Sequence, residues 1–344
     1  MKTPLSLQSP LNYQVIQRRT AREGVIPVAG HCAVACDRVE VRLAGTTGWL
    51  PAKLDAKGNF KTNLWAPAGG WYVLKVRANT GATARVSHVG VGEVFVGAGQ
   101  SNSTSCGGFQ SKSPRDGRTQ PKSGMVSTFD GTRWRIAHDP QPGAHDTITG
   151  GSFWPAFGDA MAARFNVPIG VAMTGHAGTS IRQWTKDDVL FQWTLARLRQ
   201  LGRDCFRALL WHQGETDADM RMPADRYAAG LGEIIGDFRK AIGRDFPFFI
   251  AQATFIPWPR ENVFREIRGA QRRLWKEGIA LQGPDTDAMR GALRDMDGKG
   301  IHFSKKGLKV HGEAWAVKVG AWLEAALAQQ APSGRRTHHQ RSRL

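Results

Sequence analysis

Three short polar stretches carry side chains that could serve as a nucleophile, a general base and an orienting acid. The first, at 99–102, reads Gly-Gln-Ser-Asn, and the second, at 212–215, reads His-Gln-Gly-Glu. Each follows a short apolar run, whereas the third stretch places His302 after a glycine-containing loop. A serine, a carboxylate and a histidine at the ends of elements are the parts of a catalytic set for acyl transfer.

Ser101 is the candidate nucleophile because it stands where an apolar run ends in a glycine turn. The run at 94–98 predicts a buried parallel strand. The carboxyl edge of such a sheet is where open α/β sheets bind ligands. Peptide N–H groups of the turn can there face the oxyanion that forms when the hydroxyl attacks. Taken alone, the stretch is explained equally well as an ordinary strand end.

His302 is the candidate base because it lies between a glycine-rich loop and a predicted helix, late in the chain. His88, His138 and His145 fall in less ordered contexts. His311 lies on the predicted closing helix, where packing is the commoner role of a histidine. His302 is therefore the histidine expected to take the proton of Ser101.

These stretches resemble the sialate O-acetylesterase and acetylxylan esterase branch of the SGNH (GDSL-like) hydrolases. That family carries a Gly-Gln-Ser-x block, a His-Gln-Gly-Glu block and an Asp-x-x-His block, and the resemblance covers roughly residues 88–327 in this order. The first two blocks match, but position 299, three before His302, is Lys. The resemblance implies a serine hydrolase that removes O-acetyl groups from sugars through an acyl-enzyme, without a cofactor.

The resemblance also implies which groups form the oxyanion hole. Two backbone N–H groups and one side-chain amide are expected there: Ser101, Gly178 and Gln213. Gly178 opens the Gly-Thr-Ser block after a predicted strand, and Gly175 is the second choice for this role. Gln100 and Asn102, which flank the serine, are candidates for substrate contact.

The orienting acid stays open at this point. Lys299 cannot orient the imidazole, and in some relatives the Glu of the His-Gln-Gly-Glu block takes the role. Glu215 is therefore the first choice, followed by Asp297 and then by Asp295. A Ser–His dyad helped by a backbone carbonyl is a further possibility.

The chain around these residues predicts a three-layer α/β/α domain with a mostly parallel sheet over residues 89–328, because strand and helix patterns alternate there. Helices are expected at 152–165, 190–202, 227–242, 265–278 and 307–327, and strands at 94–98, 167–173, 208–211, 246–253 and 279–283. Residues 103–152 predict a long loop that walls the substrate cleft, with disorder over 110–123 as the alternative.

The two ends of the chain differ from this central part. Residues 1–88 alternate apolar and polar side chains between turn signals, which predicts a small β-sandwich. That part could bind substrate or serve as a spacer. Residues 329–344 are rich in Pro, Ser, Gly, Arg and His and predict a disordered basic tail.

Charge restricts the class of partner. The 344 residues include 47 Lys and Arg against 29 Asp and Glu, a formal net charge of +18. The basic residues are spread through the chain and dense only in the tail, and no nucleic-acid-binding motif accompanies them. We therefore expect no nucleic-acid function, and affinity for anionic glycans or a general basic bias of the proteome fits the charge better.

Other patterns are missing from the sequence. Apolar runs are too short for a membrane span, and residues 1–19 contain no apolar signal segment. A cytoplasmic location is the default and export stays open, as does the oligomeric state. Metal-ligand spacings and phosphate-binding loops are also missing, so neither a metal nor a cofactor is expected.

Three functions compete on this basis. The leading one is a serine esterase that removes O-acetyl groups from an acetylated glycan such as xylan, or from sialic acid. A short-chain lipid or aryl esterase is the second. The third is a non-catalytic glycan-binding protein on the same scaffold, which the Lys at position 299 favours.

Overall fold

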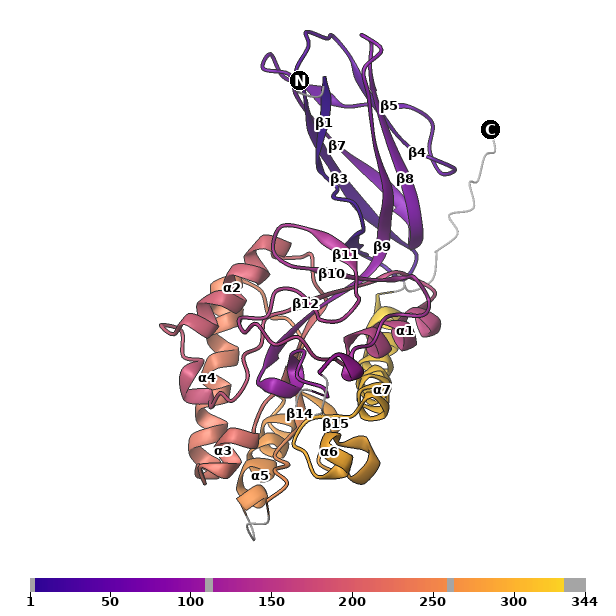
Figure 1. The fold of residues 1–344 in the computed structure, drawn as a ribbon. Coiled ribbons are helices and arrows are strands. Elements are labelled where there is room, and N and C mark those ends of the chain that lie inside the picture. The colour runs from indigo at the N-terminus through magenta and orange to yellow at the C-terminus, as the bar shows by residue number, and fades with distance from the viewer. Residues whose placement is uncertain (1–3, 109–113, 259–262, 331–344) are drawn as a thin grey trace, which may run out of the picture.

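The computed structural model describes residues 4–108, 114–258 and 263–330 (Figure 1). An elongated β-rich part carries the N-terminus, and an α/β part follows it in the chain. The predicted disordered tail lies almost wholly outside the described residues, since α7 (Lys305–Gln329) ends just before residue 331.

The N-terminal part consists of two facing sheets around one apolar core. One sheet has the order β1 (Leu5–Ser9), β3 (Glu23–Cys32), β7 (Asn59–Pro67) and β6 (Lys53–Leu54). Opposite lie β2 (Gln14–Gln17), β4 (Val39–Leu43), β5 (Leu50–Pro51), β8 (Gly69–Ala78) and the first half of β9 (Thr83–Gly99). Every second side chain of β4 is fully buried, as the alternation predicts.

Strand β9 belongs to both parts of the molecule. Up to Gly92 it pairs with β2 and β8, and from Glu93 it pairs with β12 (Ile169–Met173) and β13 (Ala208–His212). The fully buried carboxylate of Glu93 marks the crossing, where Arg18 and Arg207 bind it at 2.6 and 2.7 Å. The domain boundary expected between residues 88 and 89 therefore falls inside a continuous strand.

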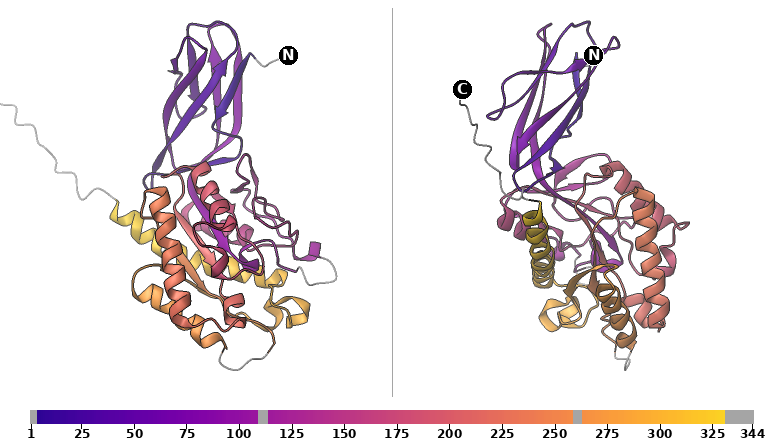
Figure 2. Two further views of the ribbon diagram at one scale, coloured as in Figure 1. Left: turned by 90° about the vertical axis from the view of Figure 1, so that its left-hand side faces the viewer. Right: turned by 180° about the vertical axis from the view of Figure 1, so that it is seen from behind.

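The second part is a three-layer α/β/α domain around a mostly parallel sheet, which confirms the predicted fold class. The strand order is β11 (Trp134–Ile136), β10 (Val126–Phe129), β12, β9, β13, β14 (Phe248–Gln252) and β15 (Leu281–Asp285), and only β11 is antiparallel to its neighbour. Helix α1 (Trp154–Phe165) packs with α7 on one face. The other face is covered by α2 (Val189–Leu201), α4 (Ala224–Ile242) and α5 (Val263–Lys276) (Figure 2).

Helix α4 illustrates why the long elements follow from the sequence. Leu231, Ile234, Ile235 and Phe238 recur with helical spacing, and all four side chains are buried. Gly243 ends the helix in the left-handed conformation, with φ of +68°. The helix begins only three residues before the predicted start at 227.

The segment expected to be one long loop is partly regular. Strands β10 and β11 lie within it, and β10 extends the central sheet beside β12 with all four side chains buried. Of the stretch 110–123, where disorder was the alternative, residues 110–113 lie outside the described residues, and Pro114–Gly117 forms the short helix η2. Across the described ranges, no helix is both long and apolar enough to cross a membrane.

Candidate active site

Ser101 lies in a tight turn at the carboxyl edge of the central sheet. Strand β9 ends at Gly99, where an added Cβ would lie 2.2 Å from the carbonyl oxygen of His212. The N–H of Gln100 donates to that same carbonyl at 2.8 Å. Ser101 then opens the short helix η1 (Ser101–Ser103), and its carbonyl accepts from the N–H and the hydroxyl of Thr104. The ends of β9 and β13 thus fix the position of the serine.

Gln100 positions the serine turn. Its side chain is buried, and its Oε1 accepts from the N–H groups of Gly214 and Thr216, both at 3.2 Å. These N–H groups belong to the start of α3 (Glu215–Asp219). The contact of Gln100 with substrate stays a prediction.

Asn102 joins all three sequence stretches. Its Nδ2 donates to Glu215 Oε1 at 3.0 Å and to the carbonyl of Ile301 at 3.3 Å. The residue after Ser101 is therefore bonded to the carboxylate of the second stretch and to the residue before His302. The buried amide of Asn102 thus holds the protein segments together, and its contact with substrate stays a prediction.

Among the described carboxylates Asp295 comes nearest to His302 Nδ1, and Glu215 lies near enough to raise the pKa of the imidazole. Its Nδ1 is 3.9 Å from Asp295 Oδ2, and the Asp295 N–H donates to the His302 carbonyl at 3.0 Å. Gly300 permits this approach, because a Cβ there would come within 1.7 Å of Asp295 Oδ1. Asp297 is exposed in the left-handed region with φ of +55°, and Glu215 is bonded elsewhere.

The protonation of His302 suits a general base. Burial lowers the pKa of His302 to about 4, with Glu215 acting to raise it and Arg294 to lower it. The imidazole is therefore neutral near pH 7 and can accept a proton. Within the described ranges no hydrogen bond joins Ser101 to His302, so their segments meet through Asn102 and Ile301.

Glu215 is an ionised carboxylate in a buried position. Burial raises the pKa of Glu215, but the nearby His212 and the hydrogen bonds from His212 and Asn102 outweigh it, so the pKa lies below its ordinary value. His212 Nε2 lies 3.0 Å from Glu215 Oε1, the same oxygen that accepts from Asn102. Glu215 thus anchors the site from α3.

The loop after β12 carries Gly178, the glycine expected to contribute to the oxyanion hole. Gly178 is exposed with φ of +70°, and a Cβ there would meet nothing within 4 Å. Among the described hydrogen bonds, none uses the N–H of Ser101 or of Gly178. Gly175, the second choice, packs against the serine turn, since a Cβ there would lie 2.3 Å from Ser103 Oγ.

Gln213 is engaged within the protein through both ends of its amide. Its Nε2 donates to the carbonyl of Thr179 at 3.0 Å and to the carboxylate of Asp217, and its Oε1 accepts from Tyr227. These bonds brace the loop that carries Gly178, and the role of Gln213 as the third oxyanion donor stays a prediction.

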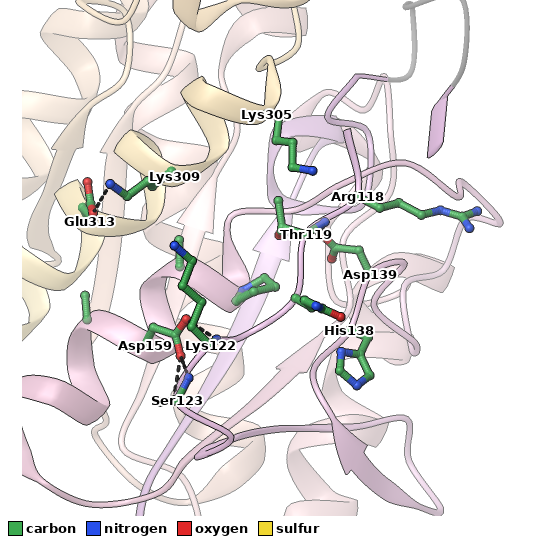
Figure 3. A pocket seen from close by; sticks show the side chains of 14 residues that line it. Arg118, Thr119, Lys122, Ser123, His138, Asp139, Asp159, Lys305, Lys309 and Glu313 are labelled. Carbon is green, nitrogen blue, oxygen red and sulfur yellow. Dashed lines mark hydrogen bonds and ion pairs between the residues drawn. The ribbon is translucent and has the colours of Figure 1, made fainter. Parts of the chain in front are cut away.

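A cavity of about 930 Å³ lies between α1, the start of α7 and the segment that leads into β10 (Figure 3). Its acidic side chains are engaged: Asp159 accepts from Ser123, and Glu313 pairs with Lys309 at 3.4 Å. In the part of the chain that the structure describes, Lys122 and Lys305 have no acidic partner. The lining holds the basic side chains of Arg118, Lys122, Lys305 and Lys309 against the acidic ones of Asp139, Asp159 and Glu313, so basic side chains exceed acidic ones by one.

Arg294 escaped sequence reasoning. This buried side chain donates to the carbonyls of Thr286, Met289 and Ile301 and holds the loop before His302. His311, expected to pack on the closing helix, is fully buried in α7 and contacts His212. No group of three or more His, Cys, Asp or Glu side chains within the described ranges could hold a metal ion.

Acidification should destabilise the protein before its carboxylates titrate. Burial lowers the pKa of His302 to about 4, and burial together with His212 holds the pKa of His311 well below its ordinary value. In the unfolded chain both histidines bind protons near pH 6.5, so the unfolded state binds more protons below about pH 6.5. The free energy of unfolding should fall from about pH 6.5 to about pH 5, measured as the urea midpoint. A midpoint that stays constant over this interval would contradict the burial of neutral histidines.

Comparison with known proteins places these observations in context. Residues 91–319 match the family model described as carbohydrate esterase, sialic acid-specific acetylesterase. A probable carbohydrate esterase of Arabidopsis thaliana is 27% identical over 165 residues. That match covers 43% of this chain and 63% of the Arabidopsis protein, less than two thirds of its length.

Two solved structures share the fold. A carbohydrate acetylesterase from Xanthomonas citri superposes with a TM-score of 0.59 at 20% identity, covering 91% of this chain and 74% of that one. The structure of the Arabidopsis thaliana protein gives a TM-score of 0.52 at 21% identity, covering 67% of this chain and 98% of that one. At these identities the similarity establishes the architecture.

Proposed function

The chain belongs to the sialic acid-specific acetylesterase family of carbohydrate esterases, a family of carboxylic ester hydrolases, and we propose that it hydrolyses O-acetyl esters on sugars with Ser101 as nucleophile. The observation that carries this proposal is Asn102, which bonds the serine turn to Glu215 and to Ile301 beside His302. A non-catalytic binding protein would have no need to hold these three stretches together.

The proposed reaction proceeds through an acetyl-enzyme. His302 takes the proton of Ser101 as Oγ attacks the acetyl carbon, and the N–H groups of Ser101 and Gly178 stabilise the oxyanion. The ester C–O bond then breaks, and His302 returns the proton to the sugar oxygen. A water attacks the acetyl-enzyme with His302 again as base, releasing acetate and restoring Ser101.

We assign the orienting role to Asp295. It is the carboxylate nearest His302 Nδ1, at 3.9 Å, and it is fixed by the backbone bond to the His302 carbonyl. A carboxylate at Nδ1 selects the tautomer whose Nε2 lone pair faces the serine. Catalytic hydrogen bonds often tighten only when substrate binds, so the 3.9 Å separation fits this role.

Acetate release by the wild type separates the competing functions. The proposal expects turnover of O-acetylated sialic acid or acetylated xylan, with p-nitrophenyl acetate as a general substrate. Hydrolysis of p-nitrophenyl butyrate without turnover of any acetylated sugar would favour a short-chain lipid or aryl esterase. Binding of the glycans without any ester hydrolysis would favour the non-catalytic binding protein.

The charge of the cavity beside α7 favours an anionic sugar over a neutral one. Lys122→Glu with Lys305→Glu should raise KM for O-acetylated sialic acid by about 3- to 10-fold, because each partly exposed ion pair contributes up to about 1 kcal/mol. The KM for p-nitrophenyl acetate, which carries no charge, should stay within about twofold. Lys318→Glu on α7, outside the cavity lining, is the matched control.

An unchanged KM for O-acetylated sialic acid in this double variant would contradict the anionic substrate. Equal KM values for acetylated xylan in the wild type and the variant would then point to a neutral glycan.

A further inference from the structure

A second cavity, of about 830 Å³, lies where the N-terminal part of the protein meets the α/β part. Strands β1, β2, β3 and β7 contribute to its wall from one side, and β10, β11 and the segment between α2 and β13 contribute from the other. That segment leads into β13 at the amino edge of the parallel sheet, whereas Ser101 lies at the carboxyl edge. The cavity is therefore separate from the candidate active site, and it shares no lining residue with the cavity beside α7.

Positive charge predominates in this junction cavity. Its charged lining consists of four basic side chains and one acidic one: Arg18, Arg19, Arg207, Arg244 and Asp204. The buried Glu93, which is not part of the lining, binds Arg18 and Arg207 at 2.6 and 2.7 Å. With Glu93 counted, four positive charges stand against two negative ones, so an excess of two positive charges remains.

Arg19 and Arg244 bring this charge to one place from the two parts of the molecule. Burial and Asp204 raise the pKa of the exposed Cys205 thiol, whereas Arg244 and Arg19 both act to lower it, so both guanidinium groups lie near this thiol. Phe206 holds Arg244, because its carbonyl accepts from Nη2 at 3.0 Å and its ring centroid lies 4.3 Å from Cζ. Within the described residues, neither arginine has an acidic partner at ion-pair distance. An anion beside Cys205 would therefore meet two positive charges.

The mouth of the cavity carries groups that suit a sugar ring. Trp65 on β7 is 56% exposed, and its ring centroid lies 5.6 Å from Cζ of Arg19. It pairs across β3 and β7 with Val25, which lines the cavity. Gln8 and Asn63 line the cavity with exposed amides that make no described hydrogen bond. Amides donate and accept, which matches sugar hydroxyls, and an exposed indole offers a flat apolar face to the C–H groups of a sugar ring.

We propose that the junction cavity binds a segment of an acidic polysaccharide, with a carboxylate near Cys205 between Arg19 and Arg244 and a neighbouring sugar ring on Trp65. Arginine suits this role, because its planar guanidinium can donate two parallel N–H bonds to one carboxylate. A small inorganic anion would use the arginines alone and leave the indole and the amides unused.

The position of the cavity decides what this binding does. A segment bound at the amino edge of the sheet is not the segment whose ester reaches Ser101 at the carboxyl edge. The junction cavity therefore anchors the polymer and takes no part in the chemical step. Its binding goes beyond the proposed hydrolysis and does not depend on it.

Alkylation of Cys205 measures occupancy of the cavity directly. Oligogalacturonate, a chain of uronic acid sugars, should slow the reaction of Cys205 with N-ethylmaleimide in the full chain, followed by mass spectrometry. Cys36, which lies outside the lining, should react at its unliganded rate. Neutral xylan oligosaccharides of the same length should protect Cys205 far less. Unchanged alkylation of Cys205 in saturating oligogalacturonate would overturn the proposal.

Arg19→Glu tests the charge. The side chain is exposed, and reversing its charge replaces an attraction for the carboxylate by a repulsion. The oligogalacturonate concentration that half-protects Cys205 should therefore rise by about 5- to 10-fold. Arg85→Glu is the matched control, since Arg85 is exposed on β9 in the other sheet and lies outside the lining. An equal rise in both variants would assign the binding to the net charge of the protein and overturn the site.

Trp65→Ala tests whether the ligand is a sugar. The half-protecting concentration of oligogalacturonate should rise by about 3- to 10-fold when the indole is removed. Trp49→Ala is the matched control, because Trp49 also stacks with an arginine, Arg77 at 4.2 Å, but lies outside the lining. Protection of Cys205 by inorganic polyphosphate as good as that by oligogalacturonate, with Trp65→Ala unchanged from the wild type, would show a general polyanion site and overturn the sugar.

Esterase kinetics separate the junction cavity from the active site. Hydrolysis of p-nitrophenyl acetate by the wild type should continue at its unliganded rate when oligogalacturonate fully protects Cys205. A rate that falls in step with the protection of Cys205 would place both effects in one site and overturn the separate anchor. If the wild type hydrolyses no ester, the proposed function fails while the protection of Cys205 still decides the glycan site.

Discussion

Ser101→Ala is expected to lower kcat/KM for p-nitrophenyl acetate by about 10⁴- to 10⁶-fold, the range found when the nucleophile of a serine hydrolase is removed. The chemical reason is that no other hydroxyl occupies the turn between the ends of β9 and β13 in the same position. The Ser101 hydroxyl takes part in no described hydrogen bond, so the variant should unfold at the wild-type urea concentration.

Ser103→Ala is the control for this variant, because Ser103 lies in the same helix η1. Its buried hydroxyl donates to the carbonyl of Gln100 at 2.7 Å, so its removal should cost about 1 kcal/mol of stability. Turnover should persist in this variant. Equal activity of Ser101→Ala and the wild type would contradict the role of Ser101 as nucleophile and, with it, the proposed acetyl-enzyme.

Asp295→Asn is expected to lower kcat by about 10³- to 10⁴-fold, as when the triad aspartate of a serine protease becomes asparagine. The amide nitrogen would favour the imidazole tautomer that presents Nδ1 as the acceptor, and Nε2 could then no longer take the serine proton. The amide is nearly isosteric with the carboxyl, so the side chain of residue 295 should stay buried against Gly300 in this variant.

Two further variants identify the acid by comparison. Asp297→Asn should retain activity within about twofold, because the exposed Asp297 side chain lies in the left-handed turn away from the imidazole. Glu215→Gln should chiefly lower stability, by about 1–3 kcal/mol, since the buried carboxylate accepts from Asn102 and lies within hydrogen-bond distance of His212 Nε2. A fully folded Glu215→Gln that loses more activity than Asp295→Asn would return the orienting role to Glu215.

The long elements of the fold could be predicted from the sequence, while the short ones could not. Helix α4 repeats its apolar side chains over five turns, so the periodic signal is strong. Strands β10 and β11 have four and three residues, too few for a period, and they lie among glycines and prolines. Their place in the sheet depends on pairing with the distant strand β12, and the sequence of β10 and β11 alone does not encode that pairing.

The nucleophile and base could be named from local patterns, but the contacts around them depend on the tertiary structure. Asp295 reaches His302 because Met296 and Asp297 adopt positive φ and turn the loop back on itself, so spacing along the chain misleads. The Gln213 amide donates to Asp217, one helical turn further on. The hydrogen-bond partner of each of these side chains depends on which acceptor the folded chain brings close to it.

Strand β9 also limits how this protein can be divided or recombined. A chain cut at residue 89 would keep the half of β9 that ends at the serine turn but would lose β2 and β8, its neighbours along residues 89–92. Val89 and Val91, now fully buried, would face water on an unpaired strand, a surface that invites aggregation. Gene fusions that exchange the N-terminal module must therefore supply replacement strands in register with residues 89–92 of β9.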